Sequence, residues 1–245
     1  MKLSGVVITR DEENNILDCL SSLDFCDERI VVDSGSQDQT VARARSAGAD
    51  VYFHPFENYA DQKNFAISKA TGEWVLLIDA DERVNPALKE EIRQVLFCPS
   101  SEGYWLIRRN RVFGRFMQGG DHARDYQLRL VRAPLARFQG LVHERIILVG
   151  KTERLKEPLF HESTPTISAY MKKLNNYTAL EARSNAERKM TRVWLHMMLF
   201  PLVKAVQRWI FKAGFRDGVE GFIFIVLSAY YDFIKAAKRW ELSSR

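Results

Sequence analysis

The sequence lacks the glycine-rich signatures by which many nucleotide-binding proteins hold phosphates. No Gly-x-Gly-x-x-Gly follows the first expected strand, and Gly-x-x-x-x-Gly-Lys-Ser/Thr occurs nowhere. These motifs place backbone N–H groups against a dinucleotide pyrophosphate or against the phosphates of ATP and GTP. Their absence argues against a dinucleotide oxidoreductase and against a P-loop nucleotide hydrolase.

Cysteine is scarce, and long apolar runs are absent. Cys19, Cys26 and Cys98 are odd in number and show no Cys-x-x-Cys spacing. That pattern argues against a disulfide framework and a zinc knuckle, and it indicates a reducing compartment. No apolar run reaches the roughly twenty residues of a membrane-spanning helix, and Met1–Gly5 leads into a strand pattern without a signal-peptide layout. We therefore expect a cytoplasmic protein.

The 245 residues suit one sizeable domain with an appendage, and the net charge is concentrated in the tail. From Met190 onward nine Lys and Arg stand against four Asp and Glu, so the tail carries the whole formal charge of +5. Diffuse basicity would favour nucleic acid as a partner. A basic tail rich in Trp and Phe instead favours an anionic membrane surface, and we expect no nucleic-acid partner.

Strands and helices alternate over the first hundred residues, which predicts an α/β fold with a parallel sheet. We expect Ser36 to cap the second helix and Asn85-Pro86 to begin the fourth. The expected strands are 5–9, 29–32, 51–53 and 74–78, and the expected helices cover about 16–20, 36–47, 60–70 and 86–96.

The second half of the chain is mixed. Shorter strands are expected at 104–107, 128–131 and 146–149, and a long helical stretch opens at Thr164-Pro165-Thr166. Two apolar segments of eleven residues follow, Val193–Val203 and Gly221–Tyr231, with tryptophans alternating with basic residues around them. We favour an interfacial amphipathic helical pair. A core-packed hairpin or a dimer interface is the alternative.

The chain is organised around the stretch from Glu73 to Glu82. Five apolar residues predict a strand buried on both faces, and the run stops on Asp79 and Asp81. Ligands of open α/β sheets bind at the carboxyl ends of strands. Two acids at such an end favour a divalent cation together with a substrate phosphate, whereas the plainer interpretation is that one of them caps the next turn.

Three strand ends carry acids in one order: Thr9-Arg10-Asp11-Glu12, Asp33-Ser34-Gly35-Ser36, and Asp79-Ala80-Asp81-Glu82. This ordered set resembles the family 2 inverting glycosyltransferases of the GT-A fold, and in particular the subgroup similar to lipopolysaccharide-core β-1,4-glucosyltransferases. The chain departs from the family pattern at Asp11, where Asn is more usual, and at Ser34, where many relatives carry Asp. Further elements that resemble the family are Gln62-Lys63-Asn64, Asp125-Tyr126-Gln127-Leu128-Arg129-Leu130, Val142-His143-Glu144 and Gly214-Phe215-Arg216-Asp217-Gly218.

The resemblance implies a role for each matching residue. Glu12 and Asp33 would bind the nucleotide, Asp33 at a uracil N–H, and Thr9 would approach the ribose. Asp81, with Asp79 directly or through water and ribose, would hold Mn²⁺ or Mg²⁺ against the diphosphate. Lys63 or Arg129 would supplement the positive charge beside the diphosphate, unless Lys63 lies on a solvated helix face. His143 would be a third metal ligand or a structural histidine. Asp125 would be the general base, with Asp121 and Glu144 as rivals, and Glu144 could equally have a structural role, paired with Arg145 or Arg129. We assign nothing to His54, His122, His161 or His196.

The resemblance thus predicts a GT-A nucleotide-sugar-binding domain over residues 1–188 and a basic, aromatic-rich, membrane-associating helical extension over 189–245. The expected activity is metal-dependent, inverting transfer of a sugar, glucose in the first instance, from a UDP-sugar to a glycolipid such as the inner core of lipopolysaccharide. The protein would lie peripherally on the cytoplasmic face of the inner membrane. The alternatives are an inactive membrane-peripheral scaffold of this fold, or transfer to another lipid-linked or polysaccharide acceptor. Nucleotidyl transfer is disfavoured because the loop after the first strand is acidic and lacks glycine. The sugar, the acceptor linkage and the oligomeric state are left open.

Overall fold

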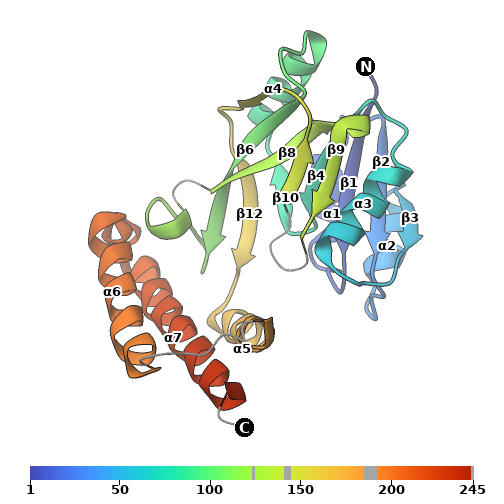
Figure 1. The fold of residues 1–245 in the computed structure, drawn as a ribbon. Helices are drawn as coiled ribbons and strands as arrows, with labels where there is room; N and C mark the ends of the chain where they lie inside the picture. The colour runs from blue at the N-terminus through green and yellow to red at the C-terminus, as the bar shows by residue number, and fades with distance from the viewer. Residues whose placement is uncertain (123–124, 141–144, 185–192, 244–245) are drawn as a thin grey trace. The chain divides into compact units, whose positions relative to one another are not determined.

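The computed structural model describes residues 1–122, 125–140, 145–184 and 193–243. The chain forms two compact units, one from Met1–Arg108 with Tyr126–His161, the other from Arg109–Asp125 with Glu162–Arg245 (Figure 1). The predicted division at residue 188 differs from this one and stays a prediction.

The first unit is built on a mixed sheet whose strands run in the order β3-β2-β1-β4-β8-β6-β12-β5. Its first four strands are parallel, and β8 joins β4 in the antiparallel direction. β8 begins in the second unit, where β6 and β12 also end. The strands of this path are β1 (Leu3–Thr9), β2 (Glu28–Asp33), β3 (Asp50–Phe53), β4 (Trp74–Asp79), β5 (Glu82–Val84), β6 (Gly103–Val112), β8 (Asp125–Arg132) and β12 (Leu159–Thr164).

Four helices pack on this sheet and give it two apolar clusters. In β4, Trp74, Leu76 and Ile78 belong to one cluster, while Val75 and Leu77 belong to the other. The alternation follows from the two-residue period of a strand and confirms the expectation that β4 is buried on both faces. The helices are α1 (Ile16–Ser22), α2 (Thr40–Ser46), α3 (Tyr59–Lys69) and α4 (Pro86–Phe97).

The predicted helix starts had opposite outcomes. Asn85 caps α4 as expected, because its side chain accepts the N–H groups of Ala87 and Leu88 at 2.9 and 3.1 Å. The prediction for Ser36 was wrong, because α2 begins only at Thr40. The hydroxyl of Ser36 donates to the Asp33 carboxylate instead, so it closes the loop after β2.

The shorter elements complete the first unit. β9 pairs with β10 and is fastened to α3 by Asn64, whose amide exchanges two hydrogen bonds of 2.9 and 2.8 Å with the backbone of Phe138. β11 runs parallel to β6. Their bounds are β9 (Ala136–Gln139), β10 (Arg145–Leu148), β11 (Thr152–Arg154) and the short helix η2 (Ala133–Leu135).

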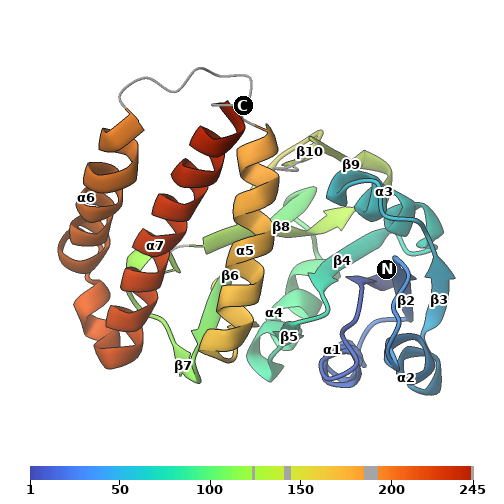
Figure 2. The same ribbon diagram turned by 90° about the horizontal axis from the view of Figure 1, so that it is seen from below.

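The second unit contains the C-terminal helices together with the end of β6. The end of β6 turns back through Phe113 and Gly114, both at positive φ, into β7 (Arg115–Phe116). α7 lies between α5 and α6 in the helical layer (Figure 2). No helix in the described part of the chain is long and apolar enough to cross a bilayer. The helices are η1 (Gly120–His122), α5 (Ile167–Ser184), η3 (Leu195–Leu199), α6 (Phe200–Val206), η4 (Gln207–Phe211), η5 (Gly214–Asp217) and α7 (Gly218–Ser243).

Candidate active site

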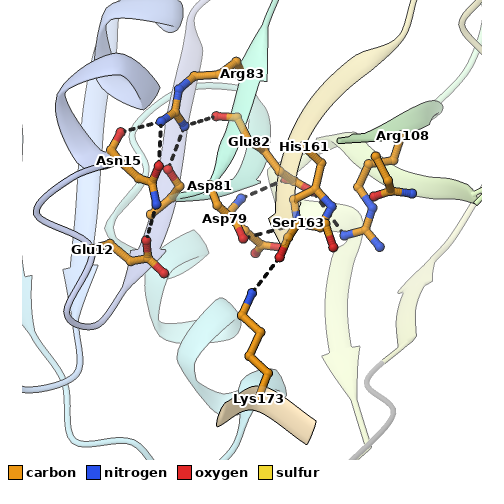
Figure 3. Close-up of polar contacts among 12 residues, drawn as sticks. Glu12, Asn15, Asp79, Asp81, Glu82, Arg83, Arg108, His161, Ser163 and Lys173 are labelled. Carbon is orange, nitrogen blue, oxygen red and sulfur yellow. Dashed lines mark hydrogen bonds and ion pairs between the residues drawn. The ribbon is translucent and has the colours of Figure 1, made fainter. Parts of the chain in front are cut away.

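Two carboxylates lie where β4 ends, as the sequence predicts. Asp79 is the last residue of β4, and its side chain is 30% exposed. Asp81 follows two residues later and is 16% exposed. The chain then enters β5 with Glu82, whose side chain is completely buried (Figure 3). The edge therefore presents two partly accessible acids above a third acid that has no access to solvent.

Arg129 ties the inner and outer acids together. β8 brings its side chain beside β4, where Nη2 lies 2.6 Å from Asp79 Oδ2 and 2.9 Å from Glu82 Oε1. Arg108 on β6 adds a longer contact of 3.3 Å to Glu82 Oε1. The second Glu82 oxygen accepts the backbone N–H of Asp79 at 2.9 Å. Glu82 thus holds both the guanidinium of Arg129 and the backbone of Asp79, whose carboxylate Arg129 neutralises.

These contacts separate the protonation behaviour of the two acids. Burial works against the charge of Asp79, but Arg129 and then Lys63 outweigh it and hold the pKa of Asp79 well below its usual range. Burial raises the pKa of Glu82 despite Arg129, and the charge of Asp79 raises it further. Asp79 is therefore ionised at neutral pH.

His161 lies beside Asp81, although sequence reasoning assigned it nothing. It pairs with Glu82 across β12 and β5, and its Nε2 is 3.2 Å from Asp81 Oδ2 (Figure 3). Within the described residues, no group of three His, Cys, Asp or Glu side chains is placed to hold a metal ion. The predicted ligand His143 lies outside those residues. The only signal for His161 is sheet pairing, which the sequence does not reveal.

Arg83 links the β4 edge to the loop after β1. Its guanidinium donates to the carbonyls of Ala80, Glu82 and Asn15 at 2.7 to 2.8 Å. The side-chain amide of Asn15 then donates to Glu12 Oε2 at 2.7 Å (Figure 3). The predicted nucleotide ligand Glu12 therefore belongs to the same polar network as the β4 acids.

The Asp33 carboxylate shapes its own loop. Asp33 is 4% exposed, and its Oδ2 accepts the N–H groups of Gly35 and Ser36 at 2.9 and 3.0 Å. The predicted contact with uracil stays a prediction. Thr9, which pairs with Asp33 across β1 and β2, has a buried hydroxyl that makes no hydrogen bond within the described structure.

The backbone conformation at position 11 accounts for one departure from the family pattern, Asp11 in place of Asn. Its φ of 53° lies in the left-handed region, where Asn and Asp are the side chains best tolerated after glycine. Its Oδ1 accepts the N–H of Gln37 at 2.7 Å, which joins the loops after β1 and β2. Asp can therefore replace Asn here without changing the backbone.

Lys63 is buried, with 6% of its surface exposed, so the alternative of a solvated helix face is wrong. It lies on α3 with its ammonium 5.3 Å from the centre of the Phe138 ring, and its charge helps to lower the pKa of Asp79. Lys63 thus adds positive charge near the end of β4, and its predicted role in donor binding stays a prediction.

The predicted general base and its rivals belong to the second unit or lie outside the described residues. Asp125 opens β8, and the side-chain amide of Asn110 lies 3.2 Å from its Oδ2. Asp121 pairs with Arg208 at 2.7 Å and with Lys212. Partial burial opposes its charge, but hydrogen bonds from Lys212 and Arg208 hold the pKa of Asp121 below its usual range, which makes it a weak proton acceptor. Glu144 is outside the described residues.

Asp217 connects the Gly214–Gly218 element to the segment that follows β7. It is buried, and its two oxygens accept the N–H groups of Gln118 and Gly119 at 2.7 and 2.9 Å. A Cβ on Gly119 would lie 2.8 Å from the Cα of Gly214, so the two backbones touch. The C-terminal helices therefore hold the loop that precedes Asp125.

Residues 4–175 match the family described as Glycosyl transferase family 2. The chain belongs to this family. It is 29% identical to the lipopolysaccharide core biosynthesis glycosyltransferase LpsC of Rhizobium meliloti (strain 1021), over 98% of this chain and 93% of the relative. It is also 30% identical to an uncharacterized glycosyltransferase of Rickettsia conorii, over 99% of this chain and 91% of the relative.

Among solved structures, the chain is similar to glucosyl-3-phosphoglycerate synthase from Mycobacterium tuberculosis in complex with Mn²⁺, UDP and glucosyl-3-phosphoglycerate. The identity is 26% and the TM-score 0.37, over 45% of this chain and 44% of the other.

Membership confirms the predicted fold class and the predicted kind of enzyme. This family 2 glycosyltransferase has a GT-A fold, whose parallel half ends in the β4 acids, and a C-terminal helical part. Of the predicted site residues, Glu12, Asp79, Asp81 and Arg129 lie in one polar network, and the charge of Lys63 helps to lower the pKa of Asp79. Glu82, Arg108 and His161 are additions that only the sheet order reveals.

Proposed function

We propose that this family 2 glycosyltransferase moves a sugar, glucose in the first instance, from a UDP-sugar to a glycolipid, with inversion at the anomeric carbon. The observation that carries the proposal is the ionised Asp79 beside Asp81 and His161 where β4 ends. The likeness to LpsC, a lipopolysaccharide core glycosyltransferase, supports an acceptor of the lipopolysaccharide inner-core type. We propose that the reaction takes place on the cytoplasmic face of the inner membrane.

The chemistry of the donor set fits a divalent metal ion. Asp81 offers a carboxylate and His161 an imidazole within 3.2 Å of each other, both partly exposed. Mn²⁺ accepts mixed oxygen and nitrogen ligands, and Mg²⁺ prefers oxygen. Asp81 and His161 would hold the ion. When bound, it would supply positive charge to the diphosphate leaving group.

Asp79 has a different role because Arg129 already occupies its Oδ2. We assign it to the nucleotide, where a fixed carboxylate can accept a hydrogen bond from a ribose hydroxyl. The buried hydroxyl of Thr9, which is without a partner in the described structure, supports a second ribose contact. Glu12 and Asp33 complete the nucleotide site in this proposal, and Lys63 adds positive charge near the phosphates.

Asp125 is the proposed general base. Its carboxylate takes the proton of the acceptor hydroxyl while that oxygen attacks the anomeric carbon. The bond from the anomeric carbon to the diphosphate oxygen breaks, and UDP leaves with the electron pair. Asn110, whose amide lies 3.2 Å from Asp125 Oδ2, keeps the carboxylate oriented.

Calorimetric titration of UDP-glucose in the presence of Mn²⁺ tests the proposal. We expect binding by the wild type and none by Asp81→Ala, while the exposed control Glu57→Gln behaves as the wild type. A thermal-shift panel of nucleotide sugars then identifies the donor, because a ligand of the native state raises Tm. A wild type that binds no UDP-sugar under any metal condition contradicts the proposal and favours the inactive scaffold.

A further inference from the structure

The helical run from residue 193 to 211 exposes a nearly continuous apolar face. Trp194 is 66% exposed, Leu202 64% and Phe211 81%. Gln207 is the only polar residue among the exposed positions of this run. Large exposed apolar patches are uncommon on soluble proteins and mark interaction surfaces. The remaining exposed residues of the face are Met198, Leu199, Phe200, Val203, Val206 and Ile210.

The face continues onto η5 and the start of α7. Phe215 is 55% exposed, Val219 69% and Phe222 55%. The ring of Trp209 meets Phe215 and Phe222 edge-on, with centroids 6.4 and 5.8 Å apart, which joins the two parts. We call the exposed apolar residues of 194–222 the apolar face.

Three of the four Lys and Arg residues in the segment 194–222 have acidic partners. Lys204 and Arg208 pair with Asp232 at 3.2 and 3.3 Å, and Arg208 and Lys212 pair with Asp121. The expectation that the tail's basicity attracts an anionic membrane stays a prediction, to which these three paired residues add little. Their charges are largely compensated by acids of the same unit.

We infer that the apolar face inserts into the interface of a phospholipid bilayer, with the helices lying flat. The inference rests on the proposed function, which requires a lipid-linked acceptor. The sign of the charge near the apolar face favours a lipid surface over a second copy of the chain. No Asp or Glu occurs from 188 to 216, and Lys204 and Lys212 are 40% and 43% exposed, so they can meet lipid phosphates. A second copy would bring the same lysines and no acid from this run.

Insertion of apolar side chains dominates binding in this arrangement, and electrostatic attraction adds little. Amphipathic helices bind in proportion to the apolar area they bury, with an added contribution from anionic lipid. Because Lys204, Arg208 and Lys212 already have acidic partners, that addition is small. We therefore expect the protein to bind vesicles of zwitterionic phosphatidylcholine, and salt to weaken binding only slightly.

Vesicle flotation with the full-length protein tests the inference. The double variant Phe200→Ser/Phe211→Ser should lower partitioning into phosphatidylcholine vesicles about tenfold or more, since two aromatic side chains no longer leave water. Phe97→Ser is the matched control, because Phe97 is 91% exposed and lies in the first unit, outside the apolar face. It should partition as the wild type does.

Folding and function are controlled separately. All variants should show wild-type circular dichroism and wild-type UDP-glucose binding. Loss of UDP-glucose binding in every protein would sink the proposed function and leave the vesicle result standing. Equal flotation of the double variant and wild type, or no flotation of the wild type, overturns the inference. A wild-type dimer by light scattering that becomes monomeric in the double variant, without vesicle binding, assigns the face to a second copy.

Discussion

Glu82 and Arg129 form a buried ion pair, with 2.9 Å between Oε1 and Nη2, beside the partly exposed acid Asp79. Neither partner is more than 5% exposed. The pair connects β5 to β8, two strands that are not neighbours in the sheet order. The ion pair therefore holds the Arg129 guanidinium beside Asp79 and also connects two separate strands of the site.

Replacing Arg129 by Met should destabilise the protein strongly. The change leaves the buried Glu82 without its nearest cation, and breaking a buried pair from one side typically costs ~3–5 kcal/mol in the free energy of unfolding. Urea denaturation measures the loss. Arg45→Met, an exposed arginine of α2 with no ion pair among the described residues, is the control. A loss of under ~1 kcal/mol would show that Glu82 is neutral in the folded state.

The stability conferred by Asp79 should depend on pH. Its folded-state pKa is depressed, so the contribution is present above the usual carboxyl value of 3.8 and is lost as pH falls through the lower folded-state value. Asp79→Asn should therefore be less stable than wild type at neutral pH, and the gap should narrow below about pH 4. Urea unfolding at pH 7 and pH 3 tests this. The exposed control Glu57→Gln should differ from wild type by the same free energy of unfolding at both pH values. A difference between Asp79→Asn and wild type that does not change with pH would be inconsistent with the ion pair.

His161→Ala should weaken binding of Mn²⁺ alone, measured by calorimetry without nucleotide. Imidazole is a better ligand for Mn²⁺ than for Mg²⁺, so the loss of Mn²⁺ affinity should exceed that of Mg²⁺. His54→Ala is the matched control, because the ring of His54 stacks on Phe65 and pairs with Asp61, which is not one of the β4 acids. An unchanged Mn²⁺ affinity would leave His161 only its hydrogen bond to Asp81.

Asp217→Asn should lower turnover on a water-soluble acceptor and leave the affinity for UDP-glucose unchanged. The substitution takes one acceptor from the N–H groups of Gln118 and Gly119, at a cost of about 1–3 kcal/mol for a buried unsatisfied donor. The loop before Asp125 then loses its fixed position. Glu220→Gln, at the exposed pair with Arg115, is the control. Steady-state kinetics and calorimetry separate the two effects, and a matching loss of UDP-glucose affinity would point to general unfolding.

The sequence predicts the strands and acids of the parallel half because long buried runs end abruptly at Thr9, Asp33 and Asp79. It does not predict β5 and β12, because three-residue and irregular strands carry no apolar period. Glu82 and His161 face each other across those two strands. Their part in the site therefore depends on pairing between segments far apart in the chain.

The tail shows the same limit. Its composition correctly predicts helices and exposed aromatic residues, but not that Arg208 and Lys212 pair with Asp121 in a distant loop. The resemblance likewise proposes Asp33 for uracil without indicating that its oxygens shape the loop after β2. The composition gives the number of charged residues, but only the fold shows which of them already have partners within the protein.

The close approach of Gly119 and Gly214 has a consequence for exchange between homologues. A side chain on Gly119 would collide with the backbone of Ala213 and Gly214, and one on Gly214 would collide with Arg208 and Ile225. Asp217 binds the backbone of residues 118 and 119 at the same place. A chimera that takes its C-terminal helices from one relative must therefore inherit residues 117–122 from the same parent. Swapping only the tail would create a mismatch at residues 117–122 even where the helices themselves are compatible.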